Sequence, residues 1–357
     1  MNNSCDEFFT SEKAMARHFR ARATSGRFRG ETRAETRSWQ KKARRRFSDL
    51  LGLQHFEPVA PRARKLESVE VDGLTRETWR IQTERDVWMP FYLFIPKGAK
   101  DQKLPLVLCP HGHGSSGKWA TGGRSDIDGM ASIIEDFRYD YGVQIARAGF
   151  ITACSDARGF GERREPVQQD DSPDAFLTSS CHNLSVAGLG LGLTVQGMWT
   201  WDLMRLLDHL QNDARINAKH IGCAGLSGGG LQTLDLAALD ERIKAAVVSG
   251  YFYGVRESLQ IQNANCACNI VPGLWEQFDM GDIAAMIAPR ALFIETGDAD
   301  PLNGKSGLKN VRSQIEITRV AYEMSEASEN LIHHVFEGEH RWDGERSIPW
   351  LREKLAR

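Results

Sequence analysis

From Leu104 onward the sequence alternates short apolar runs with segments of helical periodicity, and this alternation constrains the fold more than any other feature. Apolar runs bounded by turn residues predict buried strands, and longer periodic segments predict helices. Strands that alternate with helices favour a mostly parallel central sheet with helices on both faces. The predicted strands are 104–109, 150–155, 221–226, 243–249, 291–296 and 331–336, and the predicted helices include 140–148, 195–211 and 229–239.

The chain before this alternation divides into two parts. Residues 66–96 contain clusters of β-forming residues separated by turn signals, so they predict a meander of strands. Residues 1–64 are rich in Arg and Lys and carry aromatic and leucine residues at loosely helical spacing. They predict a basic helical extension that packs on the main domain, 65–357, or on a partner subunit in a homo-oligomer.

Composition excludes several classes of protein. The 357 residues carry a net charge of −2, and acidic residues are interleaved with the basic ones of the extension, so no nucleic-acid partner is expected. No apolar run approaches the roughly 18 residues of a membrane span. Seven scattered cysteines suit free thiols in a reducing compartment. Because the N-terminus also lacks the pattern of a signal peptide, we expect a cytoplasmic protein without a membrane partner.

The motif Gly225-Leu226-Ser227-Gly228-Gly229 reads G-x-S-x-G and joins a predicted strand to a predicted helix. In this context the motif is typical of a nucleophile elbow, in which a serine occupies a tight strand-to-helix turn. The turn lifts the hydroxyl out of the sheet, and the N-terminus of the following helix favours developing negative charge. The motif therefore predicts that Ser227 is a catalytic nucleophile.

An acid and a base follow the serine in chain order. The strand at 291–296 ends in Gly297-Asp298-Ala299-Asp300-Pro301, and the strand at 331–336 is followed by His340. The order Ser, carboxylate, His is that of the α/β-hydrolases. The G-x-x-D-P spacing favours Asp300 over Asp298 as the acid. His340 is favoured over His333 and His334, because those two lie inside the strand and a loop position suits a base better.

The loop Pro110-His111-Gly112-His113-Gly114 follows the first strand of the alternation. A backbone N–H from this loop would complete an oxyanion hole with the N–H that follows the nucleophile, which assigns His113 and Gly228 as donors. His111 is expected to brace the loop by hydrogen bonds. The two histidines and the pair Cys266-Ala267-Cys268 lack the partner spacing of a structural zinc site, so no metal is expected.

Two long excursions interrupt the alternation. Residues 159–195 are too long for a simple connection, so they predict a lid or cap over the active site. Their glycines at 188–192 do not follow a strand, which argues against a dinucleotide site, and no cofactor is expected. Residues 251–282 carry several aromatic residues that could line the pocket or pack in the core.

Taken together, these motifs resemble the α/β-hydrolase superfamily, specifically its acetylxylan-esterase and dienelactone-hydrolase-like branch. The resemblance covers roughly residues 66–345. The stretches that carry it are Trp88–Pro96, the HGHG loop at 111–114, Asp156–Gly161, GLSGG at 225–229, Ile287–Leu292, Gly297–Pro301 and Glu337–His340. It implies an α/β-hydrolase fold and hydrolysis by a serine. Ser227 departs from the cysteine nucleophile of dienelactone hydrolases, and Gly228 stands where related carbohydrate esterases often have Gln.

The resulting expectation is a serine carboxylesterase that hydrolyses short acyl esters, with acetylated carbohydrate as the substrate that the resemblance implies. A prolyl-oligopeptidase-like serine peptidase is the first alternative, although 64 N-terminal residues cannot build the propeller domain that such enzymes usually carry. A catalytically inactive hydrolase fold that only binds its ligand is the second. The complete set of motifs argues against it.

Overall fold

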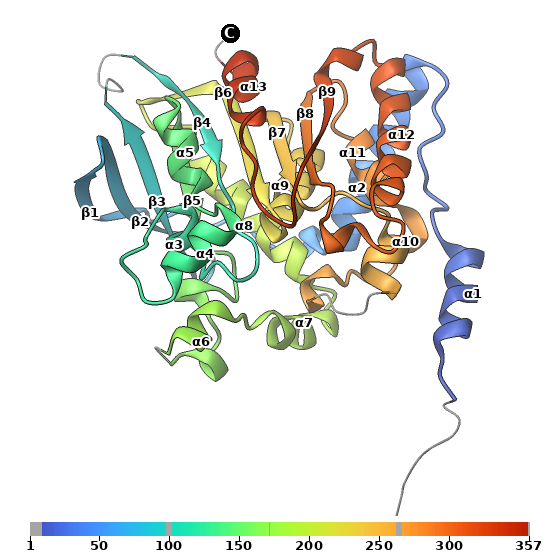
Figure 1. Cartoon of the computed structure of the whole chain (residues 1–357), viewed down its shortest axis with the longest axis horizontal. Coiled ribbons are helices and arrows are strands. Elements are labelled where there is room, and N and C mark those ends of the chain that lie inside the picture. Colours follow the sequence, from blue (N-terminus) through green and yellow to red (C-terminus); the bar gives the residue numbers. More distant parts are fainter. Residues whose placement is uncertain (1–8, 98–101, 171, 262–265, 356–357) are drawn as a thin grey trace, which may run out of the picture.

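The computed structural model describes residues 9–97, 102–170, 172–261 and 266–355. In this part of the chain, nine strands form one sheet in the order β1-β2-β3-β5-β4-β6-β7-β8-β9 (Figure 1). The pairs from β5-β4 to β8-β9 are parallel, and β1, β2 and β3 add an antiparallel edge. The strands are β1 Arg64–Val71, β2 Leu74–Glu84, β3 Val87–Pro96, β4 Leu104–Leu108, β5 Ile151–Ser155, β6 Ile216–Leu226, β7 Ile243–Ser249, β8 Ala291–Gly297 and β9 Leu331–Phe336.

Helices cover both faces of this sheet, so the predicted mostly parallel α/β architecture is confirmed. The described helices are α1 Glu12–Arg22, α2 Arg33–Leu51, α3 Lys118–Thr121, α4 Met130–Phe137, α5 Tyr141–Arg147, α6 Pro173–Leu177, α7 Cys181–Leu189, α8 Val195–Leu210, α9 Gly228–Leu239, α10 Leu274–Gln277, α11 Met280–Ala285, α12 Leu308–Met324 and α13 Ser347–Leu355. The predicted helices at 140–148, 195–211 and 229–239 correspond closely to α5, α8 and α9. The sequence analysis did not predict α12.

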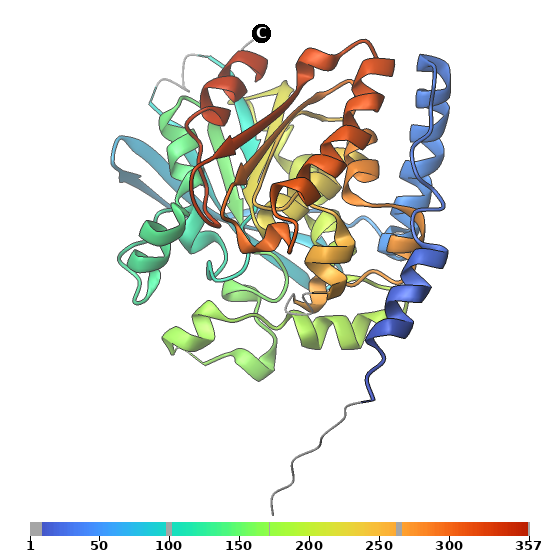
Figure 2. The ribbon, with the colours of Figure 1, turned by 45° about the vertical axis from the view of Figure 1, so that its right-hand side comes forward.

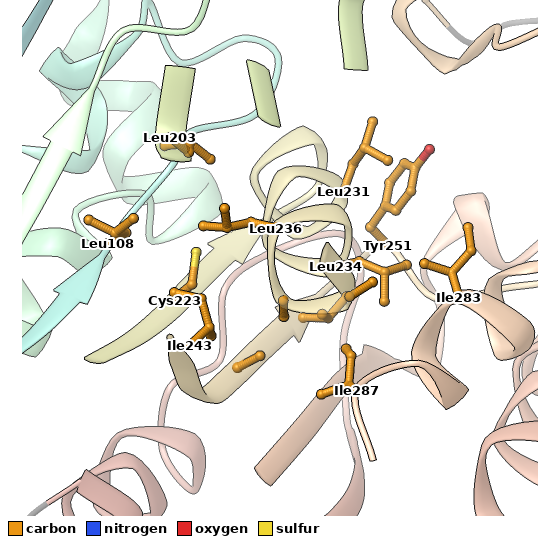
Figure 3. Close-up of a cluster of buried hydrophobic side chains, with 14 of the residues drawn as sticks. Leu108, Leu203, Cys223, Leu231, Leu234, Leu236, Ile243, Tyr251, Ile283 and Ile287 are labelled. Carbon is orange, nitrogen blue, oxygen red and sulfur yellow. The ribbon is translucent and has the colours of Figure 1, made fainter. Parts of the chain in front are cut away.

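Alternation along the strands divides the apolar residues between two cores. In β4, Leu106 and Leu108 belong to the core on one face of the sheet, whereas Val107 belongs to the core on the other. The first core includes side chains of α2, α8, α9, α11 and α12, and α9 lies in its centre (Figure 3). The second lies under α5 and α13. Strands buried on both faces explain the nearly continuous apolar runs in the sequence.

The helix α2 of the N-terminal segment is part of the first core. Its Phe47 and Leu51 are fully buried, and the amide of Gln40 donates to the carbonyl oxygens of Ala285 and Ala288 at 2.9 and 2.8 Å. α2 lies beside α12 along one side of the molecule (Figure 2). The helix α2 buries one face, and no helix in the described residues has the length and apolar character needed to cross a bilayer.

Candidate active site

Ser227 lies in the turn between β6 and α9 with φ 59° and ψ −123°. A non-glycine residue in this left-handed region costs on the order of 1–2 kcal/mol, so the conformation must be held by the surrounding packing. Gly225 allows the tight turn, because a Cβ there would lie 2.4 Å from the carbonyl group of Gly229. The Ser227 side chain makes no capping hydrogen bond to α9. Ser227 is half-buried, directly follows β6 at the carboxyl edge of the sheet, and lines a cavity there.

Asp300 and His340 form a close pair in the loops after β8 and β9. The Nδ1 atom of His340 lies 2.7 Å from Oδ2 of Asp300, and the Asp300 side chain is 1% exposed. The other oxygen of Asp300 accepts from the backbone N–H of Leu302 at 2.8 Å. Asp298 is exposed and accepts from the N–H of Gly338 at 2.9 Å. The structure thus brings Asp300 to His340, and it uses Asp298 to hold the following turn.

Gly250 connects the histidine to the serine turn. A Cβ on Gly250, directly after β7, would lie 2.9 Å from Cε1 of His340 and 3.0 Å from a methyl carbon of Leu226. The N–H of Ser227 donates to the carbonyl oxygen of Ser249 at 2.9 Å. The His340 ring therefore packs over the end of β7, beside the turn that holds Ser227.

The two competing histidines lie elsewhere. Nε2 of His333 is 3.2 Å from the hydroxyl of Thr296, and burial lowers the pKa of His333 to about 4. Nε2 of His334 is 3.4 Å from a carboxylate oxygen of Asp343. Both side chains are engaged by partners within or beside β9.

His111 braces the loop after β4. Its Nε2 accepts from the N–H of Ala157 at 3.0 Å, and its Nδ1 lies 2.9 Å from both the carbonyl oxygen of Gly112 and the hydroxyl of Ser115. Burial is the main cause that lowers the pKa of His111 to about 4. A neutral ring with both nitrogens engaged holds the loop against the segment that follows β5.

His113 and Gly228 lie next to each other at the start of α9. A Cβ on Gly228 would lie 3.2 Å from Nδ1 of His113. Gly228 is the first residue of α9, so its N–H has no partner within the helix. In the described part of the chain, the backbone N–H of His113 also has no acceptor, while its carbonyl oxygen accepts from Tyr139 at 3.2 Å. Both predicted oxyanion-hole residues therefore lie beside Ser227.

A cavity of about 500 Å³ opens in front of Ser227. Its wall combines apolar side chains with a few polar ones, among them Phe160, Thr178, Ser179, Leu231, Tyr251 and Asn269. Most of these residues come from the two segments 159–195 and 251–282. A larger hollow of about 890 Å³ beside Lys41 and Arg242 does not include Ser227 or His340, so it is separate from this site.

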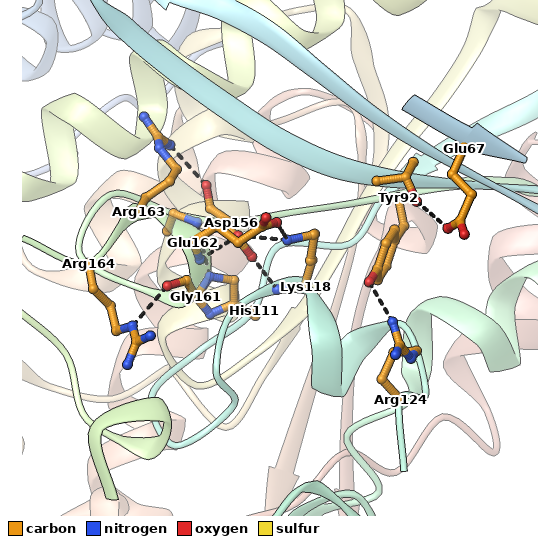
Figure 4. Close-up of polar contacts among 12 residues, drawn as sticks. Glu67, Tyr92, His111, Lys118, Arg124, Asp156, Gly161, Glu162, Arg163 and Arg164 are labelled. Carbon is orange, nitrogen blue, oxygen red and sulfur yellow. Dashed lines mark hydrogen bonds and ion pairs between the residues drawn. The ribbon is translucent and has the colours of Figure 1, made fainter. Parts of the chain in front are cut away.

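A buried ionic network anchors the segment after β5 (Figure 4). Nζ of Lys118 lies 3.0 Å from Oδ2 of Asp156 and also pairs with Glu162, and the Lys118 side chain is 1% exposed. Arg158 forms a bidentate pair with Asp202, at 3.0 and 2.9 Å. Burial alone would raise the pKa of Asp202, but Arg158 and Arg163 outweigh it and hold the pKa at about 2. The network fixes the chain that carries Phe160 into the pocket wall.

The structure also brings together residues that the sequence analysis did not connect. The ring of His113 lies beside the side chains of three cysteines. We call these four residues the Cys/His cluster: His113, Cys181, Cys266 and Cys268. Nε2 of His113 lies 3.5 Å from Sγ of Cys268 and 4.0 Å from Sγ of Cys181. The HxH and CxC pairs were visible in the sequence, but nothing in their spacing linked them to each other or to Cys181.

Comparison with known proteins identifies a family model and a related protein that match this chain. A model of the abhydrolase family matches residues 5–349. The protein named "Putative hydrolase YtaP" of Bacillus subtilis strain 168 is 26% identical over 279 residues, which are 76% of this chain and 85% of that protein.

Solved structures show the same fold. A putative acetyl xylan esterase from Bacteroides fragilis superposes with a TM-score of 0.78 at 18% identity, covering 97% of this chain and 95% of that one. A glucuronoyl esterase from Solibacter usitatus gives 0.63 at 16% identity over 89% and 93%. Acetyl xylan esterase 1 from Thermoanaerobacterium gives 0.57 at 16% identity over 95% and 96%.

Proposed function

Because this chain belongs to the abhydrolase family and is an enzyme of the α/β-hydrolase class, we propose that it is a serine carboxylesterase acting on short acyl esters. One observation carries the proposal. A strained serine at the strand-to-helix turn lies beside the end of β7, and over that end packs a histidine that a buried aspartate holds at 2.7 Å. Nucleophile, base and orienting acid are the groups that acyl transfer through a covalent intermediate requires.

In the proposed reaction, Oγ of Ser227 attacks the ester carbonyl carbon while His340 accepts the hydroxyl proton. Asp300 holds Nδ1 of His340 and stabilises the charged imidazolium that forms. The negative oxygen of the tetrahedral intermediate accepts hydrogen bonds from the backbone N–H groups of Gly228 and His113. Collapse of the intermediate expels the alcohol, which takes the proton from His340, and leaves an acyl-enzyme. Water then hydrolyses the acyl-enzyme by the same sequence of steps.

The proposed substrate is an acetyl ester of a carbohydrate. Two of the structural neighbours are named as acetyl xylan esterases, and a third is named as an esterase of glucuronoyl groups, which also derive from a carbohydrate. The cavity wall supports the choice independently, because Thr178, Ser179 and Asn269 offer hydrogen-bonding groups to a hydroxyl-rich alcohol. Phe160 and Leu231 bound the same cavity with apolar surface, which suits a small acyl group. We further propose that residues 159–195 act as a lid over this pocket.

The test is a comparison of kcat/KM for p-nitrophenyl acetate and p-nitrophenyl octanoate, beside acetylated xylo-oligosaccharides and a peptide amide. We expect acetate to be preferred over octanoate, measurable deacetylation of the oligosaccharides, and no cleavage of the amide. Each methylene that the pocket cannot accommodate should cost about 1–3 kcal/mol of discrimination.

Faster turnover of octanoate together with no release of acetate from the oligosaccharides would exclude the carbohydrate substrate but leave the serine mechanism standing. Cleavage of the amide at rates comparable to the ester would favour the peptidase alternative. Ser227→Ala protein, run in parallel, shows how much of each rate belongs to this site.

A further inference from the structure

The Cys/His cluster unites three segments that are distant in the sequence. His113 comes from the loop after β4, Cys181 is the first residue of α7, and the other two cysteines flank Ala267 in the second excursion. Their four potential ligand atoms all lie within 4.8 Å of one another. Cys181 and Cys268 are essentially inaccessible to solvent. His113 and Cys266 are half-buried and also line the cavity at Ser227. Three thiols and an imidazole nitrogen thus converge at one place in the cavity wall.

The spacing suits a tetrahedral metal ion. With Zn–S bonds of about 2.3 Å and Zn–N bonds of about 2.0 Å, tetrahedral geometry separates a sulfur from the nitrogen by roughly 3.5 Å. The distances from Nε2 of His113 to Cys268 and Cys181 are 3.5 and 4.0 Å. Small shifts of flexible Cys side chains would complete the geometry. Thiolate and imidazole ligands favour soft or borderline cations and disfavour Mg²⁺ and Ca²⁺.

We propose that the Cys/His cluster is a closed, structural Zn²⁺ site. Binding would release the three thiol protons to solvent, because the thiolate is the form that coordinates the metal. The ion would then carry four protein ligands, which leaves no open position for substrate or for a water nucleophile. The site therefore has a positioning role. This proposal replaces the expectation, drawn from spacing alone, that the chain holds no metal.

Coordination would also fix the ring that lies beside the oxyanion hole. The cysteines face Nε2 of His113, so a metal there leaves the ring proton on Nδ1. Nδ1 is the atom that faces Gly228, at 3.2 Å from the position of its missing Cβ. The metal would thus set both the orientation and the tautomer of the histidine next to Ser227. It would also join the N-terminus of α7, directly after the pocket residues Thr178 and Ser179, to the second excursion, which contributes Cys266 and Asn269 to the pocket wall.

The decisive experiment measures metal in the purified full-length protein. After expression with added zinc and dialysis, elemental analysis should find about one zinc ion per chain, as for a Cys3His site. Replacement with Co²⁺ should give the thiolate-to-cobalt charge-transfer bands and intense visible bands of tetrahedral coordination. Removal of zinc by a chelator should lower the melting temperature, and added zinc should restore it.

Variants separate this site from the other cysteines and from catalysis. Cys266→Ser/Cys268→Ser should lose the bound zinc and the cobalt spectrum. Cys223→Ser, at a buried thiol that lies 3.3 Å from Thr233 Oγ1, should retain both. Ser227→Ala should also keep its zinc while losing esterase activity, so failure of the metal site and failure of the proposed function are distinguishable.

Three results would overturn the proposal. The first is that folded wild-type protein takes up neither Zn²⁺ nor Co²⁺. This result would decide the question even if the double variant fails to fold. The second is equal zinc retention by wild type and by Cys266→Ser/Cys268→Ser. The third is a disulfide between two cysteines of the cluster in protein purified under reducing conditions, found by mass spectrometry of unreduced peptides.

Discussion

The two sides of the pocket are built in different ways. On one side, Ser227, Asp300 and His340 follow three parallel strands, so the sheet places them at its carboxyl edge as open α/β sheets generally do. On the other side, the wall depends on loops and short helices that are held by the Lys118–Asp156 network and by the Cys/His cluster. The first arrangement follows from strand order. The second depends on side chains that meet only after the chain has folded.

This difference separates the expected consequences of mutation. Changes at the carboxyl edge should remove chemistry from a protein that still folds, because the core lies below those loops. Changes in the anchoring network should lower stability first. Four predictions test whether the two sides differ in this way, ordered by the size of the expected effect.

Ser227→Ala should show the largest effect, a loss of kcat of about 10⁴–10⁶-fold, which is typical for removal of a catalytic nucleophile. Its melting temperature should stay close to that of wild type, because alanine keeps the Cβ of this strained turn and the change removes only the hydroxyl. Esterase assays and thermal unfolding measure the two quantities. Retention of a tenth of the wild-type activity would show that Ser227 is not the nucleophile of the reaction.

Asp300→Asn should reduce kcat by roughly 10⁴-fold, because an amide at this position favours the wrong tautomer of the histidine. The matched control is Asp298→Asn, which removes an exposed carboxylate that holds only the turn at Gly338. The control should stay within about tenfold of wild type. Equal losses in the two variants, or the reverse order, would transfer the orienting role to Asp298.

Lys118→Met should lower the free energy of unfolding by about 3–5 kcal/mol, because it leaves Asp156 as an uncompensated buried charge. Activity per folded molecule should change much less than in the two preceding variants. Asp126→Asn, which breaks the exposed pair with Arg124, is the control and should cost under about 1 kcal/mol. Denaturant titration gives both values. A stable but inactive Lys118→Met protein would mean that the network acts directly on chemistry.

Glu295→Gln should change the pH dependence of stability. Burial raises the pKa of Glu295 from its ordinary 4.5 to about 7. Between these values the unfolded chain releases the proton and the folded protein keeps it, so this group makes wild-type stability fall as pH rises, by about 3 kcal/mol at most. The amide oxygen of Gln can still accept from the N–H of Gly344.

The variant should therefore gain stability relative to wild type at pH 8 and show little difference at pH 4.5. Thermal unfolding across this range measures the change. A difference between the two proteins that is independent of pH would indicate a packing effect instead of titration of Glu295.

The same contrast explains which parts of the structure the sequence could predict. Continuous apolar runs located every strand from β4 to β9. The predicted start of β6 was wrong by five residues: the strand begins at Ile216 and not at 221, and the polar residues in its first half interrupt the apolar run. The helix α12 was not predicted, yet Val311, Ile315, Thr318 and Tyr322 recur at helical spacing and are buried in it. That pattern could have identified the helix.

The cluster and the network were harder to predict for a physical reason. Cys181 lies 68 residues from His113, and Cys268 lies 155 residues from it. No periodicity relates positions in separate segments this far apart, so only the folded chain shows that they are neighbours. The pair of Asp300 and His340 was predictable because each follows a strand and adjacent parallel strands end at the same edge.

The order of the strands along the chain has a consequence for synthesis on the ribosome. Chains are made from the N-terminus, and domains begin to fold as they emerge. The turn at Ser227 is complete once β6 and α9 have been made, whereas the partner histidine follows β9, the last strand of the sheet. Until β9 pairs with β8, the outer edge of β8 has no partner strand and the nascent chain lacks its proposed base. The last strand of the sheet and the proposed base are therefore added in the same late event.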